Sequence, residues 1–233
     1  MKLSAVLAVS VLGVSALAAP VEFESHRIQL SLNVPNHSAT IADSGRVELH
    51  KGWNWFYLNK TAQVSSLILN GKNSTYQAFM ASDSSKLPAA IREELAKTKD
   101  VPDQMLVCFE HKKAEAARFA VVYSATFNED VSNVRFSREA VGREVSGTIL
   151  DQGAYLSPSS YFYPQGSEKL ATFALAADIP GAWESVSDGN KVGSQTAGAR
   201  KIQRWENPYQ NDGCIFMAAP YVARSVMADS TEV

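Results

Sequence analysis

The sequence contains little of what several specialised protein classes require. Its 233 residues include only two cysteines, too few for a disulfide scaffold or a four-thiolate zinc site. Neither sign of charge is in excess, with 22 Lys and Arg against 24 Asp and Glu, so the chain lacks the basic footprint of a nucleic-acid-binding protein. Because 45% of its residues are hydrophobic, it is too apolar to be intrinsically disordered. These absences leave a packed protein of one large or two small domains.

The usual catalytic and cofactor-binding motifs are also missing. The four histidines form no H-E-x-x-H or H-x-H pattern and no Cys/His cluster at metal-ligand spacing: His26, His37, His50 and His111. There is no G-x-S-x-G nucleophile elbow and no Gly-rich phosphate loop. The sequence therefore predicts no catalytic residue, metal or cofactor in this chain, and leaves open whether a longer parent protein is an enzyme.

The longest uncharged run lies at the N-terminus. Lys2 is followed by an Ala/Val/Leu-rich stretch over residues 3–17, and Ala16-Leu17-Ala18 fits the small-x-small pattern of signal peptidase sites. We expect a cleaved signal peptide over residues 1–18 and an exported, periplasmic or secreted domain over residues 19–233. The alternative, an N-terminal membrane anchor, is disfavoured because the apolar run has about 15 residues where a span needs about 20. No other stretch approaches that length, so we expect no membrane span after cleavage.

Export changes the interpretation of Cys108 and Cys214. Outside the cytosol two thiols tend to oxidise, and a disulfide closing a loop of about 106 residues contributes on the order of 4–5 kcal/mol in the chain-entropy model. We expect this disulfide, with two buried free thiols as the alternative.

Alternating apolar and polar residues predict strands through most of the chain. The clearest runs are Ile28–Val34, Phe119–Phe127 and Phe173–Ile179. After Leu67 and Leu69, the Asn70-Gly71 dipeptide favours a tight hairpin turn. Further strands are expected at 105–109, 134–136, 145–150, 201–205 and 214–218. Short strands at this spacing predict a mainly β fold, an antiparallel β-sandwich.

One helical insertion is expected around residues 87–99. Pro88 suits a first helical turn, an apolar stripe includes Leu87, Ile91 and Leu95, and Pro102 follows the end. Glu93 and Lys97 are spaced for an i,i+4 ion pair.

An aromatic loop follows the predicted strand at 145–150. Between Gly153 and Pro164 it concentrates four aromatic residues and a proline at its end: Tyr155, Tyr161, Phe162, Tyr163 and Pro164. Tyrosine has an apolar body and a polar tip, so such a loop often faces a ligand or another domain. Equally, the loop could fold back onto its own sandwich, because an uncovered aromatic cluster is a liability for a soluble monomer. These residues are the candidate domain-interface or substrate-side loop.

Several blocks, in order, resemble a known family. They are His26–Val34, Phe56–Asn59, Leu67–Gly71, Gly153–Leu156, Tyr161–Pro164, Lys169–Phe173, Ile179–Trp183 and Val186–Gly189. Together they resemble the saddle-like N-terminal β-domain of the membrane alanyl aminopeptidase (aminopeptidase N) family of gluzincin zinc metallopeptidases, most closely its exported bacterial branch.

The resemblance implies a non-catalytic domain that shapes the cleft of a downstream zinc peptidase domain and packs against it. That peptidase domain, with its zinc, is expected beyond residue 233 and is absent from this chain. The sequence departs from the family pattern at Ser159-Ser160, where an arginine is usual, and at Gln165-Gly166-Ser167, where D-E-P is usual. We therefore carry over no individual substrate contact.

Two alternatives place the chain in other functional classes. It could be a free-standing secreted β-sandwich that binds protein or peptide. A less favoured reading is a carbohydrate-binding module, suggested only by Trp53, Trp55, Trp183 and Trp205 together with the tyrosines.

Overall fold

The computed structural model describes residues 18–130, 145–222, 227–228 and 231–232. The expected signal peptide, apart from Ala18, and the expected strand at 134–136 lie outside the described residues. None of the helices in the described ranges has the length and apolar character needed to cross a membrane.

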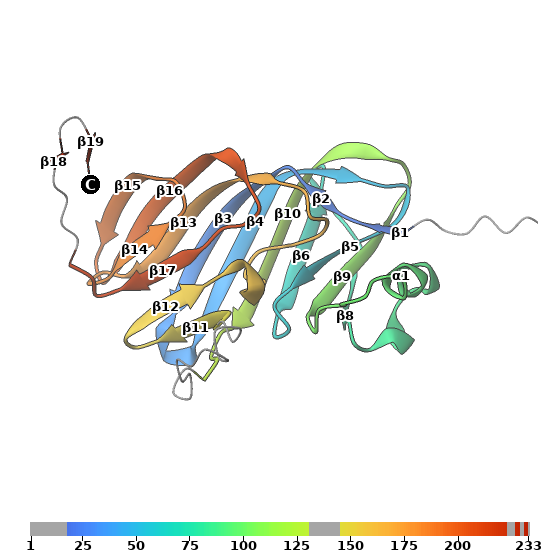
Figure 1. Ribbon diagram of the computed structural model, residues 1–233, viewed down its shortest axis with the longest axis horizontal. Helices are drawn as coiled ribbons and strands as arrows, with labels where there is room; N and C mark the ends of the chain where they lie inside the picture. The colour runs from blue at the N-terminus through green and yellow to red at the C-terminus, as the bar shows by residue number, and fades with distance from the viewer. Residues whose placement is uncertain (1–17, 131–144, 223–226, 229–230, 233) are drawn as a thin grey trace, which may run out of the picture.

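A nine-stranded sheet forms the back of the molecule (Figure 1). Its order is β15-β16-β13-β3-β4-β10-β6-β7, and the short strand β2 pairs with β4. The strands are β2 (Glu22–Phe23), β3 (Ser25–Asn33), β4 (Ser38–Leu49), β6 (Gln63–Leu69), β7 (Lys72–Asn73), β10 (Glu115–Thr126), β13 (Ala171–Pro180), β15 (Asn190–Ala197) and β16 (Arg200–Asn211). Neighbours are antiparallel except β3 and β13, which run parallel. This parallel pair joins the first and last thirds of the chain.

Two four-stranded sheets lie side by side against one face of the large sheet (Figure 1). The first consists of β1 (Ala18–Pro20), β5 (Gly52–Leu58), β9 (Met105–His111) and β8 (Gln77–Met80), with β1 parallel to β5. The second consists of β11 (Gly147–Leu150), β12 (Gly153–Leu156), β17 (Phe216–Ala219) and β14 (Glu184–Ser187). A separate pair, β18 (Met227–Ala228) and β19 (Thr231–Glu232), follows near the C-terminus. The predicted mainly β sandwich is confirmed.

The main core lies between the large sheet and the two smaller ones. Strand β10 shows why: Phe119, Val121 and Tyr123 are buried at 2%, 0% and 0% exposure, whereas the residues between them are more exposed. Alternate side chains of a strand point to opposite faces, so the period of two in the sequence becomes one covered face and one open face. We name these the inner face and the outer face of the large sheet.

The predicted hairpin at Asn70-Gly71 is confirmed. It links β6 to β7, and both turn residues have positive φ, 49° and 77°. Two successive residues of positive φ suit the right-handed twist of the strands they join, and asparagine and glycine tolerate that conformation best.

The helical insertion is present but shorter than predicted. A 3-10 turn, η2 (Ser84–Lys86), precedes α1 (Ala89–Leu95), and Pro88 is the N-cap of α1. Ile91 and Leu95 are buried against the first small sheet, on the side that faces away from the main core. The predicted pair of Glu93 with Lys97 is wrong.

Lys97 instead lies 2.7 Å from Glu94, three residues earlier in the chain. The reason is that α1 ends at Leu95, so Lys97 is already beyond the regular helical turns that would bring an i,i+4 partner alongside.

The predicted disulfide is not formed in this structure, where Cys108 and Cys214 are both free and buried. Cys108 belongs to the small cluster between the first small sheet and α1, whereas Cys214 belongs to the main core. The two thiols therefore point into different hydrophobic clusters, and the alternative of two buried thiols describes them. Burial raises the pKa of each thiol to about 12, which leaves both protonated and unreactive at neutral pH.

Candidate functional site

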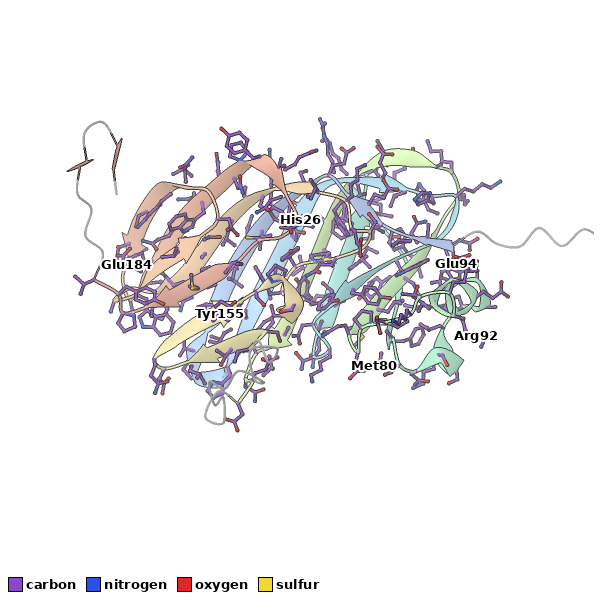
Figure 2. The ribbon with its side chains drawn as sticks, in the orientation of Figure 1. His26, Met80, Arg92, Glu94, Tyr155 and Glu184 are labelled. Carbon is purple, nitrogen blue, oxygen red and sulfur yellow. The ribbon has the colours of Figure 1, made fainter. Side chains whose placement is uncertain are left out.

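The aromatic loop divides between the core and the surface. Phe162, Tyr163 and Pro164 are buried, whereas Tyr155 and Tyr161 are half-buried. Tyr155 lies on β12 in the second small sheet (Figure 2), away from α1 and its residues Arg92 and Glu94. The structure thus brings Tyr161, Tyr163 and Pro164 together at one site and leaves Tyr155 outside it. The loop folds back for about half of its aromatic content.

Tyr161 itself has a strained backbone conformation. The 3-10 turn η3 (Pro158–Ser160) ends at Tyr161, which has a left-handed φ of 53°. That conformation costs a non-glycine residue about 1–3 kcal/mol, and hydrogen bonds offset it. The Asn59 backbone N–H donates to the Tyr161 carbonyl at 2.9 Å, and the Asn59 side-chain amide donates to the Ser160 carbonyl at 2.8 Å. Asn59 therefore fixes the position of the loop.

Tyr161 stands at the wall of a groove of about 870 Å³. The groove lies between the segment after Tyr161, the first small sheet and the C-terminal side of α1; its apolar walls include Trp55, Tyr57, Tyr161 and Tyr163, and Gln165 and Lys169 are among its polar residues. We name it the aromatic groove. The rings of Tyr57 and Tyr161 meet edge to face at 6.1 Å between centroids.

Both tyrosine hydroxyls remain neutral at physiological pH. Burial, together with the neighbouring Tyr161, raises the pKa of Tyr57 to about 12. Burial also raises the pKa of Tyr161. Neutral phenols can donate and accept hydrogen bonds, so the groove offers apolar rings with polar tips to whatever enters it.

Gln165, Gly166 and Ser167, one of the two segments that depart from the family pattern, line the floor of the groove. The backbone of Gln165 pairs with Tyr57 through two hydrogen bonds of 2.7 and 3.0 Å. A Cβ on Gly166 would lie 1.9 Å from the Val21 carbonyl oxygen, so only glycine fits there. The Ser167 N–H then donates to the same carbonyl at 2.9 Å. This segment is fixed between β5 and the N-terminal strands.

A buried histidine–aspartate pair lies behind the groove. Nδ1 of His26 donates to Oδ2 of Asp43 at 2.6 Å, and the two residues are 3% and 2% exposed. The imidazole is stacked between the rings of Phe23 and Phe173, at centroid distances of 4.8 and 5.1 Å. Within the described ranges the His26 side chain makes no hydrogen bond to a serine or cysteine. The pair is therefore placed to stabilise the core under the groove.

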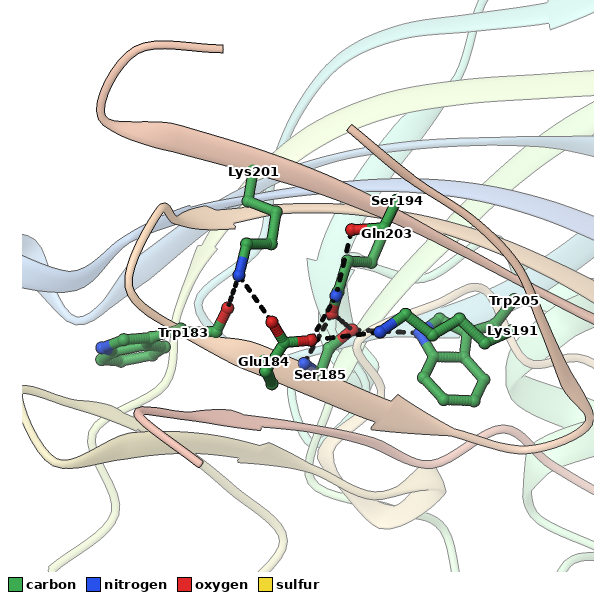
Figure 3. Close-up of polar contacts among 8 residues, drawn as sticks. All are labelled: Trp183, Glu184, Ser185, Lys191, Ser194, Lys201, Gln203 and Trp205. Carbon is green, nitrogen blue, oxygen red and sulfur yellow. Dashed lines mark hydrogen bonds and ion pairs between the residues drawn. The ribbon is translucent and has the colours of Figure 1, made fainter. Parts of the chain in front are cut away.

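A second polar cluster joins strand β14 of the second small sheet to strands β15 and β16 of the large sheet (Figure 3). Glu184 on β14 accepts hydrogen bonds from Lys201 at 2.6 Å, Gln203 at 2.6 Å and Lys191 at 3.1 Å. These donors lower the pKa of Glu184 to about 2, the Lys201 hydrogen bond contributing most. The Gln203 carbonyl oxygen in turn accepts from the backbone N–H and the hydroxyl of Ser185, both at 2.7 Å.

The hydrogen bonds of this cluster stabilise the fold. Gln203 is fully buried, and both ends of its amide are satisfied, as a buried polar side chain requires. Trp205 adds a hydrogen bond from its indole N–H to the Ser185 hydroxyl at 3.0 Å. We name it the Glu184 clamp, because it ties the edge strand β15 and its neighbour β16 to the second small sheet.

The four tryptophans that suggested a carbohydrate-binding module differ in burial. Trp55 and Trp183 are buried at 5% and 6% exposure, and Trp53 and Trp205 pack as half-buried residues against the two cores. Stacking on a carbohydrate needs an accessible aromatic face, which the buried Trp55 and Trp183 do not offer.

No metal site is found in the part of the chain that the structure describes. No three His, Cys, Asp or Glu side chains in these ranges lie close enough together to hold an ion.

The comparisons with known proteins rest on the fold. No protein-family model and no curated protein matches the chain. An M1 zinc metallopeptidase from Deinococcus radiodurans superimposes over 91% of this chain with a TM-score of 0.59 and 13% identity. The fold is that of the N-terminal region of M1 zinc aminopeptidases.

Two further solved structures share this fold. Legionella pneumophila aminopeptidase A, solved in complex with aspartic acid, matches 88% of the chain with a TM-score of 0.58 and 8% identity. Native yeast LTA4 hydrolase matches 89% with a TM-score of 0.56 and 11% identity. The chain spans 46%, 22% and 30% of these three M1-like structures, in the order named.

Sequence reasoning missed part of the aromatic groove. Trp55 and Tyr57 lie in the run Trp53-Asn54-Trp55-Phe56-Tyr57, in which almost every residue of β5 is buried. A run without alternation is the signal of a strand covered on both faces, and it could have shown that this strand has a second packed side. The Glu184 clamp has no such signal, because its members are ordinary polar residues on three strands.

Proposed function

We propose that this chain is the non-catalytic N-terminal domain of an exported zinc aminopeptidase-like protein. The observation that carries the proposal is the fold match, which covers about nine-tenths of this chain but less than half of each matching M1-like structure. A domain with this fold and no nucleophile or metal cluster among its described residues suits a supporting role beside a catalytic domain.

The aromatic groove is the surface that we assign to the interface. The half-buried Tyr161 and the more deeply buried Tyr57 line the groove with aromatic rings and neutral hydroxyls. Tyrosine is enriched where one protein surface meets another. The floor of the groove is held rigid by the Gln165–Tyr57 backbone pair and by Gly166. A rigid wall of this kind can shape one side of the cleft of a downstream peptidase domain.

The proposal places zinc in the downstream domain. There it would supply the Lewis acid and the activated water of a metallopeptidase. Residues of this chain would contribute shape and hydrogen bonds at the edge of that cleft. The chain would be exported by the signal peptide expected at residues 1–18, into the periplasm or outside the cell.

A second candidate is a free-standing β-sandwich that binds a protein or peptide in the same groove. The observation in its favour is the groove itself, which is open and offers tyrosine hydroxyls and the charged Lys169 to a polypeptide. Fold alone does not decide between the two candidates.

The genomic sequence distinguishes the two candidates. Reading the genomic sequence past codon 233 should show an in-frame continuation that encodes H-E-x-x-H. An immediate stop codon would overturn the first candidate and leave the free-standing module. Purified residues 19–233 should in either case show no chelator-sensitive aminopeptidase activity, and activity that a zinc chelator abolishes would contradict both.

A further inference from the structure

The outer face of the large sheet is open and has a shallow centre. On β13, β4 and β10 several of its side chains are small: Ala42, Ser44, Ala120, Ala174 and Ala176 are all half-exposed. Gln29 on β3, opposite Ala42 and Ala176, is larger and exposed, and the small side chains leave a low floor beside it.

Three arginines rise beside this floor on adjacent strands. Arg46 on β4 and Arg118 on β10 are directly opposite each other, and Arg27 on β3 is opposite Ser44, two residues before Arg46. Opposite residues of an antiparallel pair have Cβ atoms about 4.5–5.5 Å apart and diagonal ones about 7–8 Å. Long arginine side chains at these positions can reach a common point. All three line one hollow of about 560 Å³, together with Ser25 and Ser44.

Their charges are not compensated by neighbouring carboxylates. Across residues 18–130 and 145–222 no ion pair involves Arg27, Arg46 or Arg118. Along the chain the nearest glutamates are Glu24 for Arg27, Glu48 for Arg46 and Glu115 for Arg118. None of the ion pairs among the described residues joins them to these arginines, and Glu115 pairs with His111 and Lys113 instead. Like charges directly opposite in a sheet are destabilising. By contrast, Arg200 at the edge of the same sheet lies 2.9 Å from Asp178.

The geometry favours a tetrahedral oxyanion over a carboxylate. Each guanidinium presents a planar fork of N–H donors that matches two oxygens of one anion. A carboxylate has only two oxygens, whereas a phosphate or sulfate group has enough to receive three guanidinium groups from three sides. The hydroxyl of Ser44, on the strand between Arg27 and Arg118, adds a neutral donor.

We propose that Arg27, Arg46 and Arg118 form a binding site for a phosphate or sulfate group on the outer face of the large sheet. The site goes beyond the proposed peptidase-domain role and is independent of it. Arg27 follows His26 in β3, so its side chain points away from the aromatic groove behind which His26 lies. Either proposal can fail without the other.

The test is a calorimetric titration of the full chain, after removal of its signal peptide, with inorganic pyrophosphate and with sodium sulfate at low ionic strength. We expect saturable binding of one anion per chain. Arg46→Gln and Arg118→Gln should each weaken it at least tenfold. Arg118→Lys should also weaken it several-fold, because an ammonium keeps the charge but not the planar fork. The relative affinities for the two anions show which group the site prefers.

The matched control is Arg92→Gln, which removes an equal charge from an exposed position on α1. It should change the affinity less than twofold. An equal loss in Arg92→Gln, the absence of saturable binding, or stronger binding of a poly-glutamate peptide than of pyrophosphate would each overturn the proposal. Thermal melts of every variant keep the result interpretable, since exposed arginines can be replaced without unfolding the sheet.

Discussion

The Glu184 clamp makes the stability of the domain depend on pH. Glu184 has its pKa lowered from 4.5 to about 2 by Lys201, Gln203 and Lys191. Each unit corresponds to roughly 1.4 kcal/mol, so the full shift corresponds to roughly 3 kcal/mol. Because the side chain remains 26% exposed to solvent screening, we discount this to about 1–2 kcal/mol. The carboxylate stabilises the fold above its unfolded pKa, and this contribution is lost as the pH falls toward the folded pKa.

Glu184→Gln removes the charge and keeps the size. We expect it to lower the free energy of unfolding in urea by about 1–2 kcal/mol at pH 7. At pH 3 the difference from the parent should fall below half of that, because the unfolded parent is by then largely protonated. Glu206→Gln on the outer face of β16 is the control and should have little effect at either pH. A Glu184→Gln difference that is the same at pH 3 and pH 7 would refute the reasoning.

Three further predictions follow from packing. Gly166→Ala should lower the melting temperature markedly, with a cost of about 1–3 kcal/mol, because its Cβ would overlap the Val21 carbonyl; an unchanged melting temperature would contradict the close approach. Phe162→Ala should cost about 3–5 kcal/mol in urea unfolding, since Phe162 is fully buried; a loss below 1 kcal/mol would show that the loop does not fold back. Thiol titration should detect no fast-reacting thiol in the native protein and two thiols after denaturation without reductant, since Cys108 and Cys214 are free and buried. Detection of no thiol after denaturation would show that the two cysteines form a disulfide.

Local patterns in the sequence predicted the parts of the fold that depend on one strand or one turn. The alternation at Phe119–Phe127 became β10, and Asn70-Gly71 became a hairpin with two residues of positive φ. In each case the period of side-chain burial or the conformational preference of two residues decides the outcome.

Those local patterns could not predict interactions between residues that are distant in the sequence. The parallel pairing of β3 with β13 joins strands about 140 residues apart, and periodicity is the same for parallel and antiparallel neighbours. The position of Tyr161 at the groove depends on hydrogen bonds from Asn59, roughly a hundred residues earlier. The separation of Cys108 from Cys214 depends on which face of each strand is covered by α1 or by the large sheet.

The central claim is that the aromatic groove packs against a downstream peptidase domain of the same chain. The direct measurement is photo-crosslinking of the protein made from its whole natural gene, with p-benzoylphenylalanine in place of Tyr161. Tyr209, which is 78% exposed and outside the groove, provides the control position. The account predicts an intramolecular crosslink from position 161, and not from 209, to peptides that follow residue 233. A gene product with no such peptides, or crosslinks from position 161 only to separate proteins, would contradict it.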